Sequence, residues 1–184
     1  EKAILNVSGQ GQAAYFIDGD RIPDSFRPTY PSEYKKTVIY NTYDVTNQMS
    51  IGGHRFGILL SNLRIVFESP RYNDIFPMLI FQLDIEYKDG TKETIVSDES
   101  FLTADSPVVF SLTLYGEKYD ARLEIKDWCV YGSDVSNFEP VEITEGFGGE
   151  LRKTKAPPIR IKEELEGKEI KPGIFDFGKI TAGH

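Results

Sequence analysis

Ionisable side chains crowd into one short stretch, YGEKYDAR at residues 115–122, directly after an apolar run. Glu117 and Asp120 supply carboxylates there, and Arg122 supplies a guanidinium group. Paired carboxylates can carry out acid–base hydrolysis, carboxylate oxygens can bind a hard cation, and an acid beside an arginine can form an ion pair. In an extended chain Asp120 and Arg122 share a face and can pair directly, whereas Glu117 points the opposite way. This spacing favours a structural ion pair between Asp120 and Arg122 over catalysis, and it leaves Glu117 as the functional candidate.

Other catalytic and metal-binding patterns do not occur in the sequence. The two histidines and the single cysteine, Cys129, are far apart, so no zinc-ligand spacing exists. No glycine-rich phosphate loop opens a helix, and no serine lies in a nucleophile elbow. His54 follows two glycines and is interpreted as an exposed loop residue. Cys129 follows Trp128 and is interpreted as a small buried thiol.

Composition limits the class of partner. The chain has 184 residues and a formal net charge of −8, which argues against nucleic acid as a ligand. No apolar stretch approaches the roughly 18 residues that a membrane span requires. The length fits one large domain, and the single cysteine excludes an internal disulfide. Because the chain opens EKAILNVSG, without an initiator Met or a signal peptide, we expect a processed or excised piece of a longer protein.

Short strands must position these residues. β-rich segments recur about every ten residues and end at turn residues such as Asp18-Gly19, a pattern typical of an all-β fold. The pattern predicts an antiparallel β-sandwich, a jelly roll of the galactose-binding type. The expected strands are 3–9, 13–19, 36–46, one or two within 55–69, two within 78–100 joined at 88–91, 108–117 and 121–132.

The clearest expected strand has two distinct faces and lies well before the charged end of the chain. Its apolar face carries Leu79, Phe81, Leu83, Ile85 and Tyr87, and its polar face carries Gln82, Asp84, Glu86 and Lys88. The only helix-like stretch is 159–167, and it is expected to be a single turn. Composition divides the chain into a sandwich at 1–140, a linker or extended arm at 141–173, and a last strand at 174–184 that returns to the sandwich or opens another β-domain.

Aromatic and acidic residues in the loops suit ligand binding. Tyr30 and Tyr34 lie in a proline-bounded loop, where their rings can stack on the C–H faces of a sugar or pack between the two sheets. Tyr40 and Tyr43 are expected to fill the space between the sheets. Oxygen ligands for calcium are available from loop Asp, Asn and Glu residues, but none forms a diagnostic spacing; the candidates are Asp24, Glu33, Asn62, Glu117 and Asp120.

Five stretches, in order, resemble the N-terminal accessory β-sandwich of bacterial α-L-rhamnosidases. They are AYFIDGDRIPD (14–24), RPTYPSEYKKTVIYNTYDVT (27–46), FQLDIEYKDGTKETIVSDESF (81–101), YGEKYDAR (115–122), and APPIRIKEEL (156–165) with GIFDFGKITAG (173–183). The resemblance covers residues 3 to 183, nearly the whole chain. The loops depart most from the family: Tyr30 stands where the family has tryptophan, and Glu33 where it has aspartate.

The resemblance implies a non-catalytic carbohydrate-binding or scaffold domain of a glycoside hydrolase. In that family an inverting hydrolysis is carried out by acidic residues of a helical barrel elsewhere in the chain, and some sandwiches bind L-rhamnose through calcium. Carried over to this sequence, the sugar would contact Tyr30, Glu33, Tyr34 and Asn62, and calcium would be bound by Glu33, Asn62 and Glu117. The resemblance also implies that 174–184 starts the next β-domain, and it favours a periplasmic or secreted bacterial protein.

Two other function classes stay open at this point. The domain can be a pure structural spacer or an adhesion-type sandwich without a sugar site. It can also be a free-standing glycosidase or lyase with a jelly-roll cleft, although the spacing of the acidic residues argues against catalysis.

Overall fold

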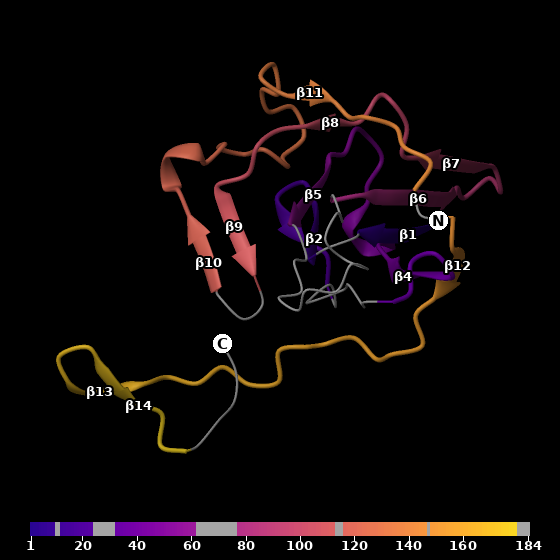
Figure 1. Ribbon diagram of the computed structural model, residues 1–184. Helices are drawn as coiled ribbons and strands as arrows, with labels where there is room; N and C mark the ends of the chain where they lie inside the picture. Colours follow the sequence, from indigo (N-terminus) through magenta and orange to yellow (C-terminus); the bar gives the residue numbers. More distant parts are fainter. Residues whose placement is uncertain (10–11, 24–31, 62–76, 113–115, 147, 180–184) are drawn as a thin grey trace.

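Two layers of β-strands form the molecule in the computed structural model, which describes residues 1–9, 12–23, 32–61, 77–112, 116–146 and 148–179 (Figure 1). The strands are β1 (Lys2–Gly9), β2 (Gln12–Ile17), β3 (Asp20–Arg21), β4 (Thr37–Asp44), β5 (Phe56–Ser61), β6 (Leu79–Glu86), β7 (Lys92–Val96), β8 (Leu102–Thr103), β9 (Val108–Leu112), β10 (Gly116–Tyr119), β11 (Glu139–Pro140), β12 (Glu150–Lys153), β13 (Lys168–Lys171) and β14 (Ile174–Asp176). Two 3₁₀ turns, η1 (Thr46–Gln48) and η2 (Ala121–Leu123), are the helical elements of this described part. No helix within it is long and apolar enough to cross a membrane.

The larger layer is a five-stranded sheet in the order β12-β4-β1-β6-β7, and the second contains the sheet β3-β2-β5. The pairs β1–β4, β1–β6 and β6–β7 are antiparallel, as are β2–β3 and β2–β5. The hairpin β9–β10 and the short pair β8–β11 form separate two-stranded sheets (Figure 1). This arrangement confirms the predicted all-β sandwich, with one difference: β12 joins β4 in parallel.

The core lies between these sheets and follows the alternation of the strands. In β1, the side chains of Ala3, Leu5 and Val7 point inward and are almost fully buried. They pack with inward residues of the other strands, namely Ala13, Tyr15, Ile17, Ile22, Tyr43, Val45, Phe81 and Leu83. In β6, Phe81 and Leu83 are buried and Gln82 and Glu86 are exposed, which confirms the predicted faces of that strand.

Several local predictions can be compared directly with the strands. Asp18 has a φ of 49° and Gly19 a φ of 95°, which confirms the tight turn between β2 and β3. The strand predicted at 121–132 is wrong: η2 and a series of turns occupy these residues, and Asp127 has a φ of 54°, which interrupts any extended ladder. In the region predicted as 55–69, residues beyond Ser61 lie outside the described part.

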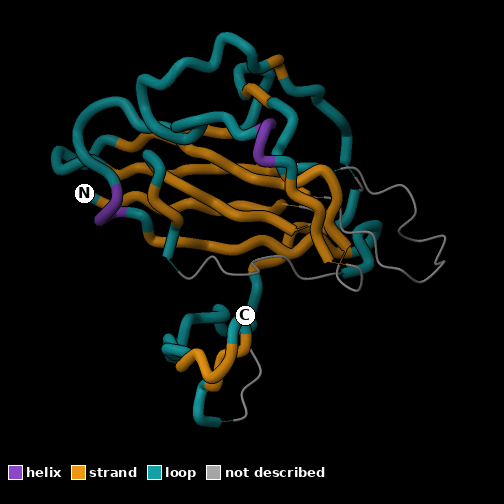
Figure 2. Tube along the Cα trace, turned by 90° about the vertical axis from the view of Figure 1, so that its left-hand side faces the viewer, coloured by secondary structure: helices purple, strands orange, loops and turns teal. Residues whose placement is uncertain are grey.

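The C-terminal third contains more pairing than its composition indicates. The helical turn predicted at 159–167 is wrong; these residues are non-helical and mostly exposed, and a single helical turn with little burial is unstable in water. Within the predicted arm, β12 pairs with β4 and β13 pairs with β14. Figure 2 shows the β13–β14 hairpin set apart from the sandwich, so the strand at the end of the chain has its described partner in the arm itself.

Candidate functional site

One end of the sandwich carries the turn with Glu33 and Tyr34, and β5 ends there at Ser61. Gly9 is paired with Leu79, and Gln12 is paired with Ser61, so these strand ends lie together. The start of β4 lies at the same end, because the Ser8 hydroxyl donates a hydrogen bond of 2.8 Å to the Ile39 carbonyl. We call this the loop end. The N-terminus, where β1 begins, lies at the opposite end (Figure 2).

A compact turn at residues 32–37 leads into β4 and carries Glu33. The carbonyl oxygen of Glu33 accepts hydrogen bonds from the backbone N–H groups of Lys36 at 2.7 Å and Thr37 at 2.8 Å. The Ser32 hydroxyl donates to the Thr37 carbonyl at 2.7 Å. The backbone therefore holds the turn in place while the Glu33 residue is exposed at the surface.

Tyr34 lies in the same turn but is 6% exposed, so its ring packs into the protein and offers no free face for stacking on a sugar. The other predicted stacking residue, Tyr30, lies outside the described residues, as does Asn62. Tyr43 is buried and stacks against Tyr15 at a centroid distance of 5.9 Å, as expected for a residue that fills the space between the sheets.

Glu117 lies on the hairpin β9–β10, beside its tip. Gly116 pairs with Leu112 at the tip, and Glu117 pairs with Ser111 (Figure 1). Glu117 is exposed. Among the residues that the structure describes, no three His, Cys, Asp or Glu side chains come close enough together to bind a metal ion. Any calcium site built on Glu33 and Glu117 would therefore need further oxygen ligands, such as the predicted Asn62.

Asp120 and Arg122 interact, but not in the extended geometry expected from their spacing. Asp120 caps η2 by accepting from the Arg122 backbone N–H at 3.1 Å. The guanidinium of Arg122 also donates to both carboxylate oxygens, through Nε at 2.8 Å and Nη2 at 2.5 Å. These hydrogen bonds from Arg122 lower the pKa of Asp120. Asp120 and Arg122 thus stabilise the turn, through the cap of η2 and through their ion pair.

A second polar cluster, at the end away from the loop end, was not expected. His54 was predicted to be an exposed loop residue, but its side chain is only 11% exposed, and its Nδ1 lies 2.5 Å from Asp18 Oδ2. Asp18 Oδ1 accepts from the Arg55 N–H at 2.8 Å, and the Arg55 guanidinium donates to Ser133. The signal in the sequence was the Asp-Gly turn, whose carboxylate faces the residues before β5 once β2 and β5 pair.

The cluster has the residue types of a serine hydrolase, yet its geometry is that of a structural clamp. The Ser50 hydroxyl is 3.4 Å from His54 Nε2, but the same nitrogen lies 3.0 Å from the Ser50 backbone nitrogen and 2.9 Å from its carbonyl oxygen. Nε2 is thus engaged by the main chain. The predicted exposure of His54 is wrong, because its side chain is held by Asp18 and by the Ser50 backbone.

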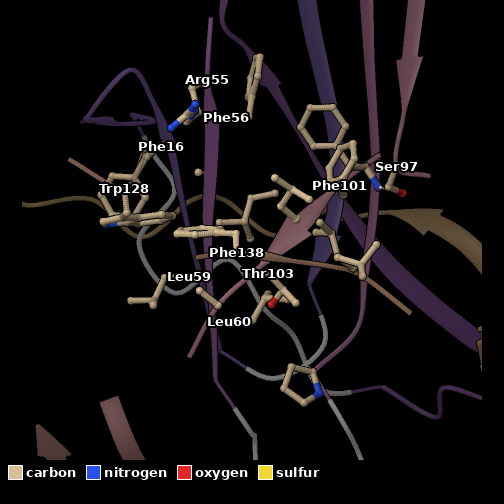
Figure 3. Close-up of a pocket in the computed structure, with 18 of the residues that line it drawn as sticks. Phe16, Arg55, Phe56, Leu59, Leu60, Ser97, Phe101, Thr103, Trp128 and Phe138 are labelled. Carbon is tan, nitrogen blue, oxygen red and sulfur yellow. Dashed lines mark hydrogen bonds between the residues drawn. The ribbon is translucent and has the colours of Figure 1, made fainter. Parts of the chain in front are cut away.

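An aromatic groove lies between the layers, and the rings that line it are only partly buried. Figure 3 shows Phe16, Phe56, Phe101, Trp128 and Phe138 around a common space. The rings contact one another edge to face, with Phe16 and Trp128 at 5.5 Å and the pair Phe81 and Phe101 at 5.6 Å. Edge-to-face contacts of this kind are typical of packed cores. Cys129 beside Trp128 is buried, as predicted, and burial raises the pKa of its thiol.

Comparison with known proteins identifies the family. The model of the α-L-rhamnosidase N-terminal domain matches residues 1–163. The chain belongs to this family.

Relatives that align with nearly all of this chain agree with its assignment as a rhamnosidase N-terminal domain. An α-L-rhamnosidase of Formosa agariphila is 28% identical over all of this chain and 21% of its own length. Solved α-L-rhamnosidases from Dictyoglumus thermophilum and Streptomyces avermitilis superpose with TM-scores of 0.84 and 0.83, at 36% and 30% identity. They cover 97% and 95% of this chain, which corresponds to 20% and 18% of theirs. The chain thus spans about a fifth of the length of these relatives.

Of the two strand pairings in the C-terminal region, β12–β4 lies within the residues that match the family and β13–β14 lies after them. The relatives named above nevertheless align through nearly the entire chain. The similarity to these relatives therefore extends past residue 163, where the family match ends.

Proposed function

We propose that the chain is a non-catalytic, carbohydrate-binding domain of an α-L-rhamnosidase and that it binds L-rhamnose units of a glycan at the loop end. The observation that carries the proposal is the convergence of strand ends at that place, where a backbone-locked turn presents Glu33 at the surface. A rigid turn with an exposed carboxylate suits a sugar, because carboxylates accept hydrogen bonds from hydroxyl groups and a fixed backbone costs little ordering entropy on binding.

The S. avermitilis relative supports the choice of ligand, since its solved structure is described as a complex with L-rhamnose. That likeness extends over 95% of this chain at 30% identity. In the proposed site, Glu33 accepts hydroxyl hydrogen bonds, and Tyr30 and Asn62 contribute the remaining stacking and amide contacts. Tyr34 supports the turn from inside, because its ring is buried.

Calcium belongs to the proposal as an aid to sugar binding. Glu33, Asn62 and Glu117 offer only oxygen ligands, which is the donor chemistry that calcium prefers. A bound calcium ion would itself be coordinated by hydroxyl groups of the sugar. Because fewer than three described acids cluster, we expect weak, millimolar-range calcium affinity, at the level of extracellular modules with about 10⁻⁴–10⁻³ M dissociation constants.

The partner of the domain is proposed to be the rest of a rhamnosidase chain. The hairpin β13–β14 and the residue after it expose large apolar side chains, namely Ile170, Ile174, Phe175 and Phe177, each about half accessible. A two-stranded hairpin is marginally stable alone, and contiguous exposed apolar residues mark a contact surface. These side chains suit burial against a further domain of such an enzyme.

A thermal-shift titration tests the sugar site. We expect L-rhamnose at millimolar concentration to raise the Tm in the presence of calcium, and EDTA to diminish the rise. Galactose is the control sugar. Glu33→Gln should remove the effect, whereas Glu86→Gln, an exposed acid at the far end of β6, should preserve it.

The alternative role is a structural spacer, favoured by the burial of Tyr34 and by the strand-paired arm. If neither the wild-type chain nor its calcium-loaded form responds to rhamnose more than to galactose, the carbohydrate-binding proposal is wrong and the spacer role replaces it. Release of nitrophenol from aryl glycosides by the purified chain would contradict the non-catalytic assignment.

A further inference from the structure

The arm is bonded to the β-sandwich beside the turn that carries Glu33. β12 pairs in parallel with the first half of β4, in a register that places Glu150 opposite Thr37 and Lys153 opposite Tyr40. The Glu150 N–H donates to the Lys36 carbonyl at 3.0 Å, and the Thr154 N–H donates to the Tyr40 carbonyl at 2.8 Å. One hydrogen bond of the arm thus ends on the turn itself, at a residue whose own N–H is bonded to Glu33.

Gly149 makes the closest approach. A Cβ atom at this position would lie 2.1 Å from the carbonyl oxygen of Tyr34 and 2.8 Å from the backbone nitrogen of Thr37. Both are backbone atoms, which cannot move aside as the end of a flexible side chain can. Gly149 lacks the left-handed φ that would itself require glycine. The demand for glycine at this position is therefore steric: the arm backbone rests directly on the turn.

We infer that Gly149 is a positioning residue, which seats the arm against the 32–37 turn and thereby fixes the place of Glu33 at the loop end. The part of this inference that concerns a ligand rests on the proposed function. The same arm continues into the apolar hairpin β13–β14. One continuous segment of chain therefore connects the turn to the hairpin that is proposed to contact further domains. Linkage then requires that a ligand bound through Glu33 also strengthens the docking of β12.

Amide hydrogen exchange followed by NMR tests the positioning without any ligand. In Gly149→Ala, exchange at the Lys36 and Thr37 amides should accelerate about tenfold, which corresponds to about 1.4 kcal/mol of lost local protection. Amides of β1 and β6 should keep their wild-type rates, because neither strand pairs with β12. Gly167→Ala is the matched control. The nearest atoms to its Cβ would be the Phe177 ring and the Phe175 Cβ, which belong to the region of the β13–β14 hairpin and not to the turn.

A second variant avoids the steric clash. Glu150→Pro removes the N–H that donates to Lys36 and places proline at the first residue of a strand, where it is tolerated. It should give the same local acceleration. Unchanged exchange at Lys36 and Thr37 in both variants overturns the inference, as does an equal rise at all amides, which indicates a merely global loss of stability.

The ligand part has its own outcome. If wild-type chain binds L-rhamnose, Gly149→Ala should weaken the affinity about tenfold, and saturating rhamnose should slow exchange at Glu150 and Thr154 in the wild type. If the wild type does not bind rhamnose, the proposed function fails while the exchange data still decide whether Gly149 positions the turn. Binding that is equal in the wild type and in Gly149→Ala overturns the link between the arm and the sugar site.

Discussion

Nδ1 of His54 lies 2.5 Å from the Asp18 carboxylate, and this contact joins the β2–β3 turn to the residues that precede β5. Asp18 also accepts the N–H of Arg55, whose guanidinium donates to Ser133, so these contacts join three chain segments.

The stability of this clamp should depend on pH. Hydrogen bonding to the Ser50 backbone and to Asp18 raises the pKa of His54 in the folded state. A raised pKa means that the stabilisation is fully present below the unfolded value of about 6.5 and is lost as the pH rises through the folded value. We therefore expect the Tm difference between the wild type and His54→Gln to be largest near pH 6 and to shrink toward pH 9. At its largest, the corresponding difference in unfolding free energy should be at most about 1 kcal/mol. A difference that grows with pH would contradict the assignment.

Acidification should weaken the same clamp from its other side. Burial alone raises the pKa of Asp18, but hydrogen bonds from the Arg55 N–H and from His54 outweigh it and lower the pKa below 3.8. Its contribution is then present above pH 4 or so and is lost as the pH falls through the lowered folded value. Acid unfolding monitored by circular dichroism should therefore begin at higher pH in Asp18→Asn than in the wild type. An identical midpoint in the two proteins would count against this role.

Gly57 is expected to tolerate no side chain. A Cβ there would lie 2.2 Å from Cys129 Cβ and 2.8 Å from the Trp128 ring. Overpacking of this kind costs about 1–3 kcal/mol, so Gly57→Ala should lower the urea midpoint with an unchanged m-value. Gly90→Ala is a useful comparison, because its φ of 84° is strained for alanine while no atom lies within 4 Å. A smaller loss at Gly57 than at Gly90 would show that the 127–133 region adjusts freely.

Tyr15 links the core to the loop end through its hydroxyl. The ring is 1% exposed, and the hydroxyl accepts a hydrogen bond from the Gly9 N–H at 3.1 Å. Burial raises the pKa of this phenol, so it stays protonated at neutral pH. Tyr15→Phe should cost about 1 kcal/mol of unfolding free energy, whereas Leu83→Ala, which opens a cavity, should cost about 2–5 kcal/mol. Chemical denaturation of both variants compares the two losses, and equal losses would contradict the packing described.

The ion pair of Asp120 and Arg122 should matter through the cap and not through the charge. The Arg122 side chain is 88% exposed, where ion pairs stabilise little. Arg122→Ala should therefore leave the Tm within error, while Asp120→Ala, which removes the cap of η2, should lower it measurably. Sodium chloride should not alter the difference between these two variants. A loss in Arg122→Ala as large as that in Asp120→Ala would assign the role to the ion pair instead.

Alternation of apolar residues predicted those elements whose two faces differ. β6 carries apolar side chains on every second residue, and its Phe81 and Leu83 face inward as expected; β1 was predicted as a strand and buries Ala3, Leu5 and Val7 in the same alternating way. The Asp18-Gly19 turn was equally readable, because few residue pairs accept two positive φ angles in succession. Where one face of a strand is buried, the alternation of apolar residues in the sequence predicts the strand and its faces.

Elements whose conformation depends on contacts with distant residues could not be predicted in this way. β12 reads ELRK and has no buried face, so nothing local distinguishes it from a linker; its strand conformation comes from bonds to β4. Residues 121–132 alternate like a strand, yet Asp120 caps a 3₁₀ turn and Asp127 adopts a positive φ. The burial of His54 depends on Asp18, 36 residues away, a contact that only the β2–β5 pairing creates.

The contacts of the candidate site residues could not be read from the sequence. Glu33 and Glu117 were predicted as loop ligands; both are exposed, but Glu117 lies in β10 and pairs with Ser111. Tyr34, however, sits beside Glu33 in the sequence and faces the interior, because the turn closes through backbone bonds that direct neighbouring side chains to opposite sides. Composition alone does not distinguish a tyrosine that binds from one that supports a binding residue.

The four residues of β12 also determine how the sandwich meets other chains. Without them β4 would be an outer strand, with its backbone N–H and C=O groups free to pair with the same strand of another molecule. β12 covers the first half of β4 and presents a short outer edge that carries Glu150, Arg152 and Lys153, the kind of charged border that resists edge-to-edge growth. β12 thus hinders self-association through the edge of β4. A rhamnosidase domain cut before Glu150 is expected to aggregate even though its core is intact.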